Sequence, residues 1–260
     1  MTARSFWLAG VVLLASCSAG GQAPDARAFF GARQPEAAAA QALGLAVDQQ
    51  PGELVLHDPE LCGARGNYIL RQTGGVPVAA TAPHGVHDRH TAELARMAYR
   101  EGTFAAAAWN SVPRRASGHC DGLDLARAAV HPFTDFALGF SDRFPDGLIV
   151  QFHGFDGDRR ESARAADAAM IVSDGTRTPG PGLFALADCL SRMAAPDRVL
   201  VYPAETGELG ARENAQAAAL RDAGGARFAH LEMSLDLRET LLADKDLRAR
   251  LTGCLEEAVA

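Results

Sequence analysis

Short apolar runs recur along the chain and alternate with segments of helical periodicity. The apolar runs typical of strands cover residues 53–57, 67–72, 76–82, 103–109, 148–152, 168–172, 199–202 and 228–233. Helical periodicity covers residues 91–101, 121–139, 182–193, 212–223 and 235–258. Pro132 is expected to kink or divide the second of these stretches. Runs such as 103–109 are apolar at nearly every position, as a strand covered on both faces requires. The alternation predicts a three-layer α/β/α domain built on a mostly buried, mixed sheet.

The amino-terminal segment has a different pattern. An apolar run at residues 6–14 follows Arg4. The run is too short for a permanent membrane span but has the length of a signal-peptide core. It ends in Leu14-Ala15-Ser16-Cys17, which resembles the lipobox of bacterial lipoproteins. The resemblance implies that Cys17 is lipid-modified and anchors the protein in the bacterial cell envelope, on the periplasmic or extracellular face. An ordinary secretory signal is the alternative.

These features divide the chain into three parts. Residues 1–16 are expected to be a lipoprotein signal peptide. Residues 17–50, which are rich in Ala, Gly, Gln and Pro, are expected to be a membrane-proximal tether with at most a short helix at 35–45. Residues 51–260 are expected to form one folded domain, because a segment of that length can bury a single core.

Four cysteines remain once Cys17 is assigned to lipid: Cys62, Cys120, Cys189 and Cys254. In an exported protein they indicate two disulfides, for which three pairings are possible. The pairing of Cys62 with Cys120 and of Cys189 with Cys254 is favoured, because each bridge then stays within one half of the chain. A cysteine zinc site is disfavoured because no C-x-x-C spacing occurs.

Charge and short motifs exclude several classes of function. The net charge is −7, and acidic and basic residues are mixed along the chain, which argues against a nucleic-acid partner. The sequence has no G-x-S-x-G elbow, which disfavours a serine hydrolase. No glycine-rich fingerprint follows a predicted strand, which disfavours a nucleotide-dependent oxidoreductase.

The turn after the predicted strand 76–82 holds three histidines and an aspartate, in the run Pro83-His84-Gly85-Val86-His87-Asp88-Arg89-His90. Strand-to-helix turns of α/β sheets are where ligands usually bind. Imidazole and carboxylate are ligands that zinc favours in catalytic sites. His84 with either His87 or Asp88 would supply two of the three ligands. A solvated histidine-rich loop is the alternative.

Two later strands carry polar residues that complete such a site. The predicted strand 148–152 ends at His153, and the strand 228–233 carries Glu232 among apolar neighbours. A carboxylate is rarely buried in a strand without a purpose. Two ligands from a loop, a distant histidine and a buried glutamate are the parts of a hydrolytic zinc site.

These segments resemble the superfamily of carboxypeptidase-A-like zinc hydrolases. The likeness is carried by Pro83-His84-Gly85 with the following Thr91-Ala92-Glu93-Leu94-Ala95, by Val150-Gln151-Phe152-His153-Gly154-Phe155, and by His230-Leu231-Glu232-Met233-Ser234. Within the superfamily they are most similar to N-formylglutamate amidohydrolases and poly-γ-glutamate hydrolases. The resemblance implies a zinc-carboxypeptidase-like (phosphorylase/hydrolase-like) fold.

The resemblance also implies roles for individual residues. His84, an acidic residue and His153 would bind zinc, and Glu232 would be the general base. The H-x-x-E spacing of carboxypeptidases selects His87, whereas the amidohydrolase spacing selects Asp88. Asp88 is favoured because a carboxylate is usual there. Arg127, which follows Asp124-Leu125-Ala126, would bind the substrate carboxylate as a two-pronged donor. A surface arginine is the alternative, and Asn110 and Arg114 are further candidates.

The expected function is that of a lipid-anchored, zinc-dependent hydrolase. It would cleave an amide bond near a carboxylate in a peptide, a γ-glutamyl compound or an N-acyl amino acid. Water activated by the metal would be the nucleophile. An inactive substrate-binding or scaffolding lipoprotein on the same fold is the alternative.

Overall fold

The structure is a computed structural model that describes residues 25–260. The predicted signal peptide and Cys17 lie outside these residues. Within them, no helix combines the length and the apolar character needed to cross a membrane. The strands are β1 (Ala46–Gln50), β2 (Glu53–His57), β3 (Asn67–Arg71), β4 (Val76–Ala82), β5 (Phe104–Trp109), β6 (Leu148–Gly154), β7 (Met170–Ser173), β8 (Val199–Val201) and β9 (Arg227–Met233).

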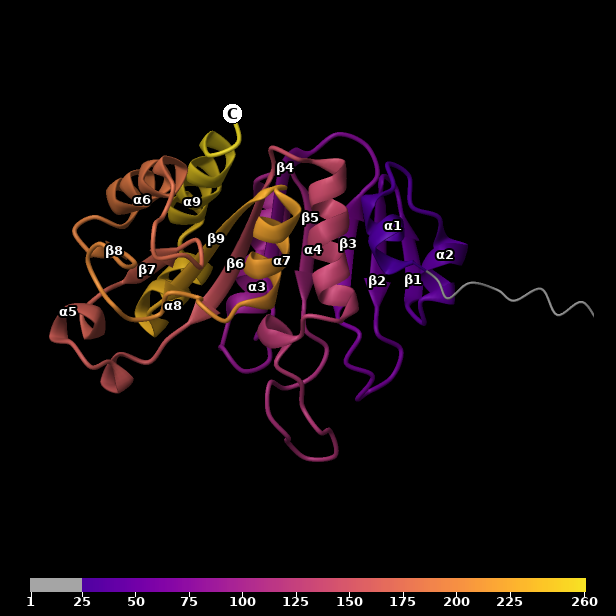
Figure 1. The fold of residues 1–260 in the computed structure, drawn as a ribbon, viewed down its shortest axis with the longest axis horizontal. Coiled ribbons are helices and arrows are strands. Elements are labelled where there is room, and N and C mark those ends of the chain that lie inside the picture. The colour runs from indigo at the N-terminus through magenta and orange to yellow at the C-terminus, as the bar shows by residue number, and fades with distance from the viewer. Residues whose placement is uncertain (1–24) are drawn as a thin grey trace, which may run out of the picture.

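All nine of these strands form one mixed sheet in the order β1-β2-β3-β5-β4-β6-β9-β7-β8 (Figure 1). Its centre, β5-β4-β6-β9, is parallel. On one side β1, β2 and β3 pair antiparallel with one another and with β5. On the other side β7 runs antiparallel to β9 and parallel to β8. The parallel centre brings the carboxyl ends of β4, β6 and β9 to the same edge of the sheet.

Helices pack on both faces of the sheet. One core contains apolar side chains of α3 (Thr91–Glu101), α6 (Pro181–Ala194), α8 (Leu235–Ala243) and α9 (Lys245–Glu257). The other contains side chains of α1 (Ala26–Gly31), α2 (Ala37–Ala42), α4 (Pro132–Arg143) and α7 (Ala215–Ala223), of which α4 and α7 lie in front of the sheet in Figure 1. The predicted mixed α/β architecture is thus confirmed. The finer likeness to zinc carboxypeptidases stays a prediction.

Most predicted strands match observed strands within one or two residues. Pro132 divides the helical stretch 121–139, as predicted, but the stretch 235–258 is also divided, which was not predicted. Residues 121–139 form a loop, a short 3-10 helix η1 (Leu125–Arg127) and then α4, which begins at Pro132. Proline is favoured at the first helical position, and the ring of His131 caps the helix by accepting the Phe133 N–H. Residues 235–258 form two helices, because the Asp244 carboxylate accepts backbone N–H groups at the start of α9.

The predicted boundary between tether and domain at residue 51 was too late. The helix α1 packs against α4, and Phe29 and Phe30 are buried there. Arg27 and Asp142 form an ion pair at 2.7 Å between the same two helices. The strand β1 pairs with β2 and forms one edge of the sheet. The alanine-rich composition resembled a tether, but two phenylalanines were enough to bind this segment to the core.

Both predicted disulfides are present. Cys62–Cys120 joins the loop after β2 to the loop after β5, and Cys189–Cys254 joins α6 to α9. Disulfides persist in oxidising compartments, so the two bridges indicate a location outside the cytoplasm.

Candidate metal centre

The polar residues predicted from the sequence converge at the carboxyl edge of β4, β6 and β9. The parallel pairing of β6 with β9 places His153 beside Glu232 and Gln151 beside His230. His84 and Asp88 lie in the turn that follows β4. All of these side chains except Gln151 line one open cleft of about 480 Å³. The sheet therefore gathers groups that are far apart in the sequence.

Three of these side chains are arranged as a metal ligand set. The Nδ1 atom of His84 lies 3.6 Å from Oδ2 of Asp88, and Nδ1 of His153 lies 3.4 Å from the same oxygen. The three residues are buried, and their ligand atoms lie within 4.8 Å of one another. His87 is exposed and does not belong to this group. Between the two candidates for the second ligand, the turn therefore brings Asp88, and not His87, to the histidine pair.

The turn after β4 explains why Asp88 and not its neighbour faces the site. The backbone N–H groups of His87 and Asp88 both donate to the carbonyl of His84, each at 2.7 Å. This closes a single helix-like turn, in which residues four apart lie on the same side. His84 and Asp88 have that spacing. The Gly154 N–H also donates to Oδ2 of Asp88 at 3.2 Å, which fixes the carboxylate against the end of β6.

Each histidine of the ligand set is held from behind. Nε2 of His84 contacts Oδ1 of Asp124 at 2.7 Å, and Nε2 of His153 contacts Oε1 of Gln151 at 3.2 Å. Asn214 in turn donates to the same Gln151 oxygen at 2.7 Å. In a metal-bound site both Nε2 atoms would carry the proton toward these acceptors, which would leave both Nδ1 lone pairs free to bind the ion beside Asp88. Such outer partners are the usual means of orienting metal-binding histidines.

The charges of the cluster favour a cation. Burial opposes ionisation of Asp88, but contacts with His153 and His84 hold its pKa far below the usual range. Burial also lowers the pKa of His84, yet Asp124 and Asp88 outweigh this and raise it overall. Burial opposes ionisation of Asp124 as well, but His84 brings its pKa to about 2. Two carboxylates thus stay ionised around one imidazole, an environment that attracts positive charge.

Glu232 lies beside this set and is buried with it. It is 9% exposed, and burial together with the charge of Asp88 raises its pKa to about 8. The neighbouring His230 contacts Oε1 of Glu232 through Nε2 at 3.5 Å. Burial lowers the pKa of His230 well below its usual range, so its ring is neutral. His153, His230 and Glu232 form a second group whose ligand atoms lie within 4.8 Å of one another.

Arg127, the predicted substrate-binding residue, lines the cleft but is mostly exposed and forms an ion pair with Glu213. Arg114 is closer to the ligand set, because its Nε donates to Asp124 at 2.8 Å. Asn110 is structural: it accepts the Val86 N–H at 3.1 Å and ties the two loops together. Six arginines line the cleft in all: Arg114, Arg115, Arg127, Arg159, Arg160 and Arg212.

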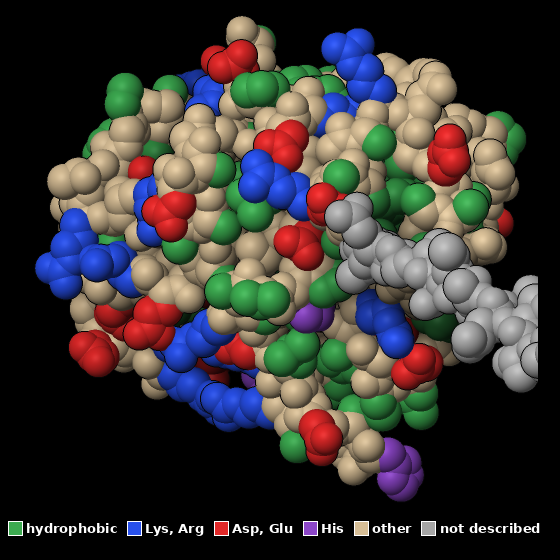
Figure 2. All heavy atoms as spheres, turned by 45° about the vertical axis from the view of Figure 1, so that its right-hand side comes forward, with side chains coloured by type: hydrophobic (Ala, Val, Ile, Leu, Met, Phe, Trp, Pro, Cys, Tyr) green, Lys and Arg blue, Asp and Glu red, His purple; other side chains and the backbone are tan. Residues whose placement is uncertain are grey.

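The space-filling view shows basic side chains gathered over the lower part of the molecule, beside a hollow (Figure 2). Most cleft arginines have acidic partners. Within residues 25–260, Arg115 and Arg212 have no ion pair, and both are exposed. The entrance to the cleft therefore offers cationic groups that are not neutralised by the protein.

Three further residues of this site, Asp124, Gln151 and His230, were given no role from the sequence, although each stands within one of the segments that carry the resemblance. Gln151 and His230 each stand two positions before a predicted site residue on the same strand. Side chains two apart in a strand point to the same face, so the two-residue repeat of a strand could have placed Gln151 and His230 beside the metal centre. Asp124 lies in an irregular loop, where no such rule applies.

Comparisons with known proteins add distant likenesses. No protein-family model matches the sequence, and no curated protein matches it either. A gene product of Agrobacterium tumefaciens is similar in structure at 15% identity and a TM-score of 0.43, covering 81% of this chain and 94% of its own. A candidate metallopeptidase of Shewanella amazonensis is similar at 14% identity and a TM-score of 0.40, covering 85% and 89%.

A candidate metallopeptidase of Shewanella denitrificans is similar to the same degree, at 14% identity and a TM-score of 0.40, covering 86% of this chain and 90% of its own. Likenesses of this size carry no argument about activity. The functional argument rests on the geometry of the site.

Proposed function

We propose that this protein is a zinc-dependent hydrolase that cleaves an amide bond near a carboxylate. One observation carries the proposal: His84 and His153 present Nδ1 to a common carboxylate, Asp88, while separate acceptors hold both Nε2 atoms. Two imidazoles and a carboxylate are a donor set of catalytic zinc, which also needs an open position such as the cleft provides here. The donors are buried and need no rearrangement of the backbone to meet.

The residues of the chain have separable tasks in this proposal. A zinc ion at this site supplies Lewis-acid chemistry, which polarises a carbonyl and makes water a nucleophile near neutral pH. Glu232 takes the proton from the attacking water and delivers it to the leaving nitrogen. Burial raises the pKa of Glu232 to about 8, and a nearby dication would lower it again. Glu232 is then a carboxylate that can accept a proton at neutral pH.

The charge of the cleft supports a substrate that is an anion. Arg115 and Arg212 stand at the entrance without acidic partners among residues 25–260. Arg127 forms an ion pair with Glu213 and would exchange that partner for a substrate carboxylate. Peptides, γ-glutamyl compounds and N-acyl amino acids all carry such a group close to an amide.

The cellular setting proposed from the sequence is the bacterial cell envelope. The lipobox-like run ending at Cys17 supports a lipid anchor. The two disulfides support an oxidising compartment. Replacing Cys17 with serine should release a soluble form or block processing, and a variant that is processed normally but stays in the membrane fraction would contradict the anchor.

Metal analysis tests the proposal directly. Protein purified without added metal should contain close to one zinc per chain, and His84→Ala or His153→Ala should lower that content well below one. His57→Ala is the matched control, because His57 is exposed and does not line the cleft. A folded wild-type protein that takes up no zinc would favour the inactive binding lipoprotein instead. A screen of γ-glutamyl peptides, cell-wall peptides and N-acyl amino acids would then identify the substrate.

A further inference from the structure

The loop between β5 and η1, residues 110–124, has little structure of its own. It contains no helix or strand, and its internal backbone bonds are an isolated bridge between Ser117 and Cys120 and one bond from Leu123 to Pro113. Residues 115–119 are all exposed. Irregular connections of this length are uncommon in compact domains and usually have a function.

This loop delivers a charged pair to the metal centre. Asp124 contacts Nε2 of His84 at 2.7 Å, and Arg114 donates to the other Asp124 oxygen at 2.8 Å. The position of the His84 ring thus depends on a loop that lacks a packed framework. A loop free to move would let Asp124 leave His84.

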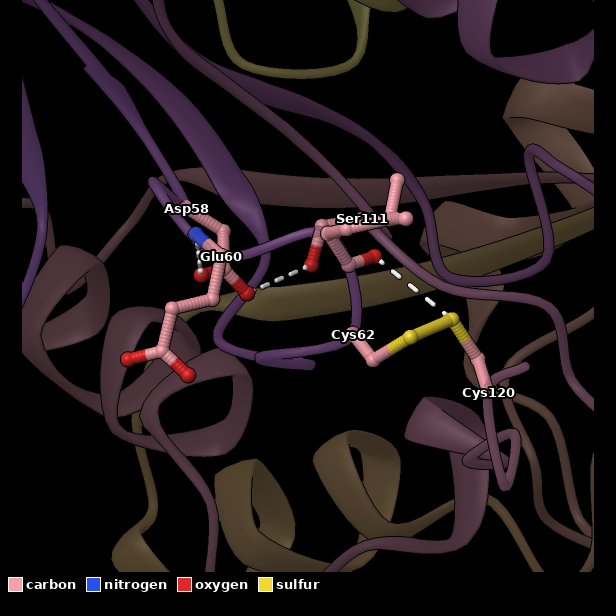
Figure 3. The surroundings of a disulfide bond; sticks show 6 residues. Asp58, Glu60, Cys62, Ser111 and Cys120 are labelled. Carbon is pink, nitrogen blue, oxygen red and sulfur yellow. Dashed lines mark hydrogen bonds between the residues drawn. A yellow bond between two sulfur atoms is a disulfide. The ribbon is translucent and has the colours of Figure 1, made fainter.

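Two attachments hold the loop to the neighbouring segment 58–66, as Figure 3 shows. Near the tip, the Cys62–Cys120 disulfide joins the two segments. Near the base, the Ser111 hydroxyl donates to Oδ2 of Asp58 at 3.0 Å and accepts the Gly66 N–H at 3.1 Å. The loop is therefore fixed to the same partner segment at its base and near its tip.

The partner segment is itself rigid, because Asp58 organises it. The Asp58 carboxylate accepts the backbone N–H groups of Arg65 at 2.7 Å and of Glu60 at 3.1 Å. A Cβ on Gly63 would lie 2.3 Å from the same carboxylate, so a larger residue here would displace the Asp58 side chain. Burial opposes the ionisation of Asp58, but the hydrogen bonds from Arg65, Glu60 and Ser111 lower its pKa overall.

We infer that the Cys62–Cys120 disulfide and the Ser111–Asp58 bond form a clamp that positions Asp124 against His84 and so maintains metal affinity. This inference rests on the proposed metal site. The clamp residues contact neither metal nor substrate, so they are positioning residues. The second disulfide, Cys189–Cys254, joins two helices on the sheet, and neither cysteine lines the cleft.

The test compares the two disulfides in the full folded chain. The variant Cys62→Ser with Cys120→Ser should bind zinc at least ~10-fold more weakly than wild type, measured by competition with a chromophoric chelator, because loss of an outer partner costs ~10–100-fold in affinity. The control, Cys189→Ser with Cys254→Ser, should bind zinc within about twofold of wild type although its melting temperature falls. Equal zinc affinity in wild type and the first variant would overturn the clamp.

Asp124→Asn separates positioning from a general loss of stability. If the clamp acts through Asp124, removing the first disulfide should cost little further zinc affinity in an Asp124→Asn protein, since coupled residues are not additive. Full additivity of the two changes would refute the inference.

If the cysteine variant does not fold, Ser111→Ala with both disulfides intact replaces it. Zinc affinity should then fall by at least ~3-fold, and an unchanged affinity would count against the clamp. A wild-type protein that binds no zinc would instead refute the proposed function, so the two failures are distinct.

Discussion

The two faces of β6 and β9 are built differently, although the same strands supply both. Toward α3, α8 and α9 the strands are apolar to their ends, with Val150, Phe152, Leu231 and Met233 buried in one core. On the opposite face Ile149 and Phe228 belong to the other core, but the residues that follow are polar: Gln151, His153, His230 and Glu232. The apolar face packs in a core along its whole length. The opposite face packs in a core only at its start, and then presents polar side chains to the cleft.

The difference shows what the polar half contributes. Burying a polar or ionisable side chain costs free energy that an apolar one would not, unless partners compensate. Gln151 is compensated by hydrogen bonds to Gln216 and Asn214. Among residues 25–260, by contrast, Glu232 makes no hydrogen bond or salt bridge other than its contact with His230, and its pKa is raised by burial. Such a group lowers stability where it stands, which is the expected mark of a residue that serves chemistry.

Glu232→Gln on the polar face should have the largest effect. Glutamine keeps the size of the side chain but cannot accept a proton, so turnover should fall by ~10²–10⁴-fold, the range that acid–base catalysis contributes. Zinc content should stay near that of wild type. Paired turnover and metal analysis on one preparation decide the matter: retained turnover would remove Glu232 from the mechanism, and lost zinc would make it a ligand.

Leu231→Ala, one residue earlier on the apolar face, should have the opposite profile. Leu231 is fully buried, and truncating such a residue costs ~2–5 kcal/mol of unfolding free energy. Zinc affinity per folded molecule should change little. Urea unfolding and a zinc titration on the same variant measure the two quantities. A variant that keeps its stability but loses zinc would mean that the two faces are not separable.

Asp124→Asn should have an intermediate effect that is confined to the metal. Asparagine can still accept a hydrogen bond from His84 but lacks the charge that favours the orientation of the ring. Zinc affinity should fall by ~10–100-fold, and chelator competition measures the change. Asp121→Asn serves as control, because Asp121 is in the same loop but is exposed and does not line the cleft. Equal losses in the two variants would show that the loop as a whole matters, and not the carboxylate that contacts His84.

His131→Asn should have the smallest effect and a dependence on pH. Burial lowers the pKa of His131 below the usual value of about 6.5. The neutral ring caps α4, so its stabilisation is fully present above about pH 6.5 and is lost as the pH falls below that value. The free energy of unfolding of wild type should therefore fall by ~1 kcal/mol at acid pH through the loss of this cap.

Asparagine caps helices without titrating, so the contribution of this position in the variant should not depend on pH. Chemical unfolding at pH 8 and pH 5 compares the two proteins. An identical pH dependence in both would show that the titration of His131 does not affect stability.

The sequence allowed the strands and the two histidine-bearing strand ends to be predicted because each is specified locally. Apolar runs identify β4, β6 and β9, and each polar residue that follows or interrupts a run stands out. Parallel pairing then determines which strand ends meet. The prediction of Asp88 as the residue that joins His84 and His153 agrees with the cluster in the structure, but whether the cluster binds zinc stays a prediction.

The remaining features depend on contacts between distant segments. Asp124 reaches His84 from an irregular loop whose path is fixed by a disulfide and by Ser111, and no periodicity reveals such a path. The segment 25–50 looks like a tether by composition, yet Phe29 and Phe30 bury themselves against α4. Composition cannot reveal a partner surface that forms only when the rest of the chain has folded.

The order of the site residues along the chain has a consequence for how the molecule assembles. His84 and Asp88 come from the turn that follows β4, and His153 comes from β6, which pairs directly with β4. Glu232 arrives only with β9, which adds to the far side of β6. A chain is synthesised from its amino terminus, so the three proposed metal ligands are all made before Glu232. The proposed base is therefore the last part of the site to be added.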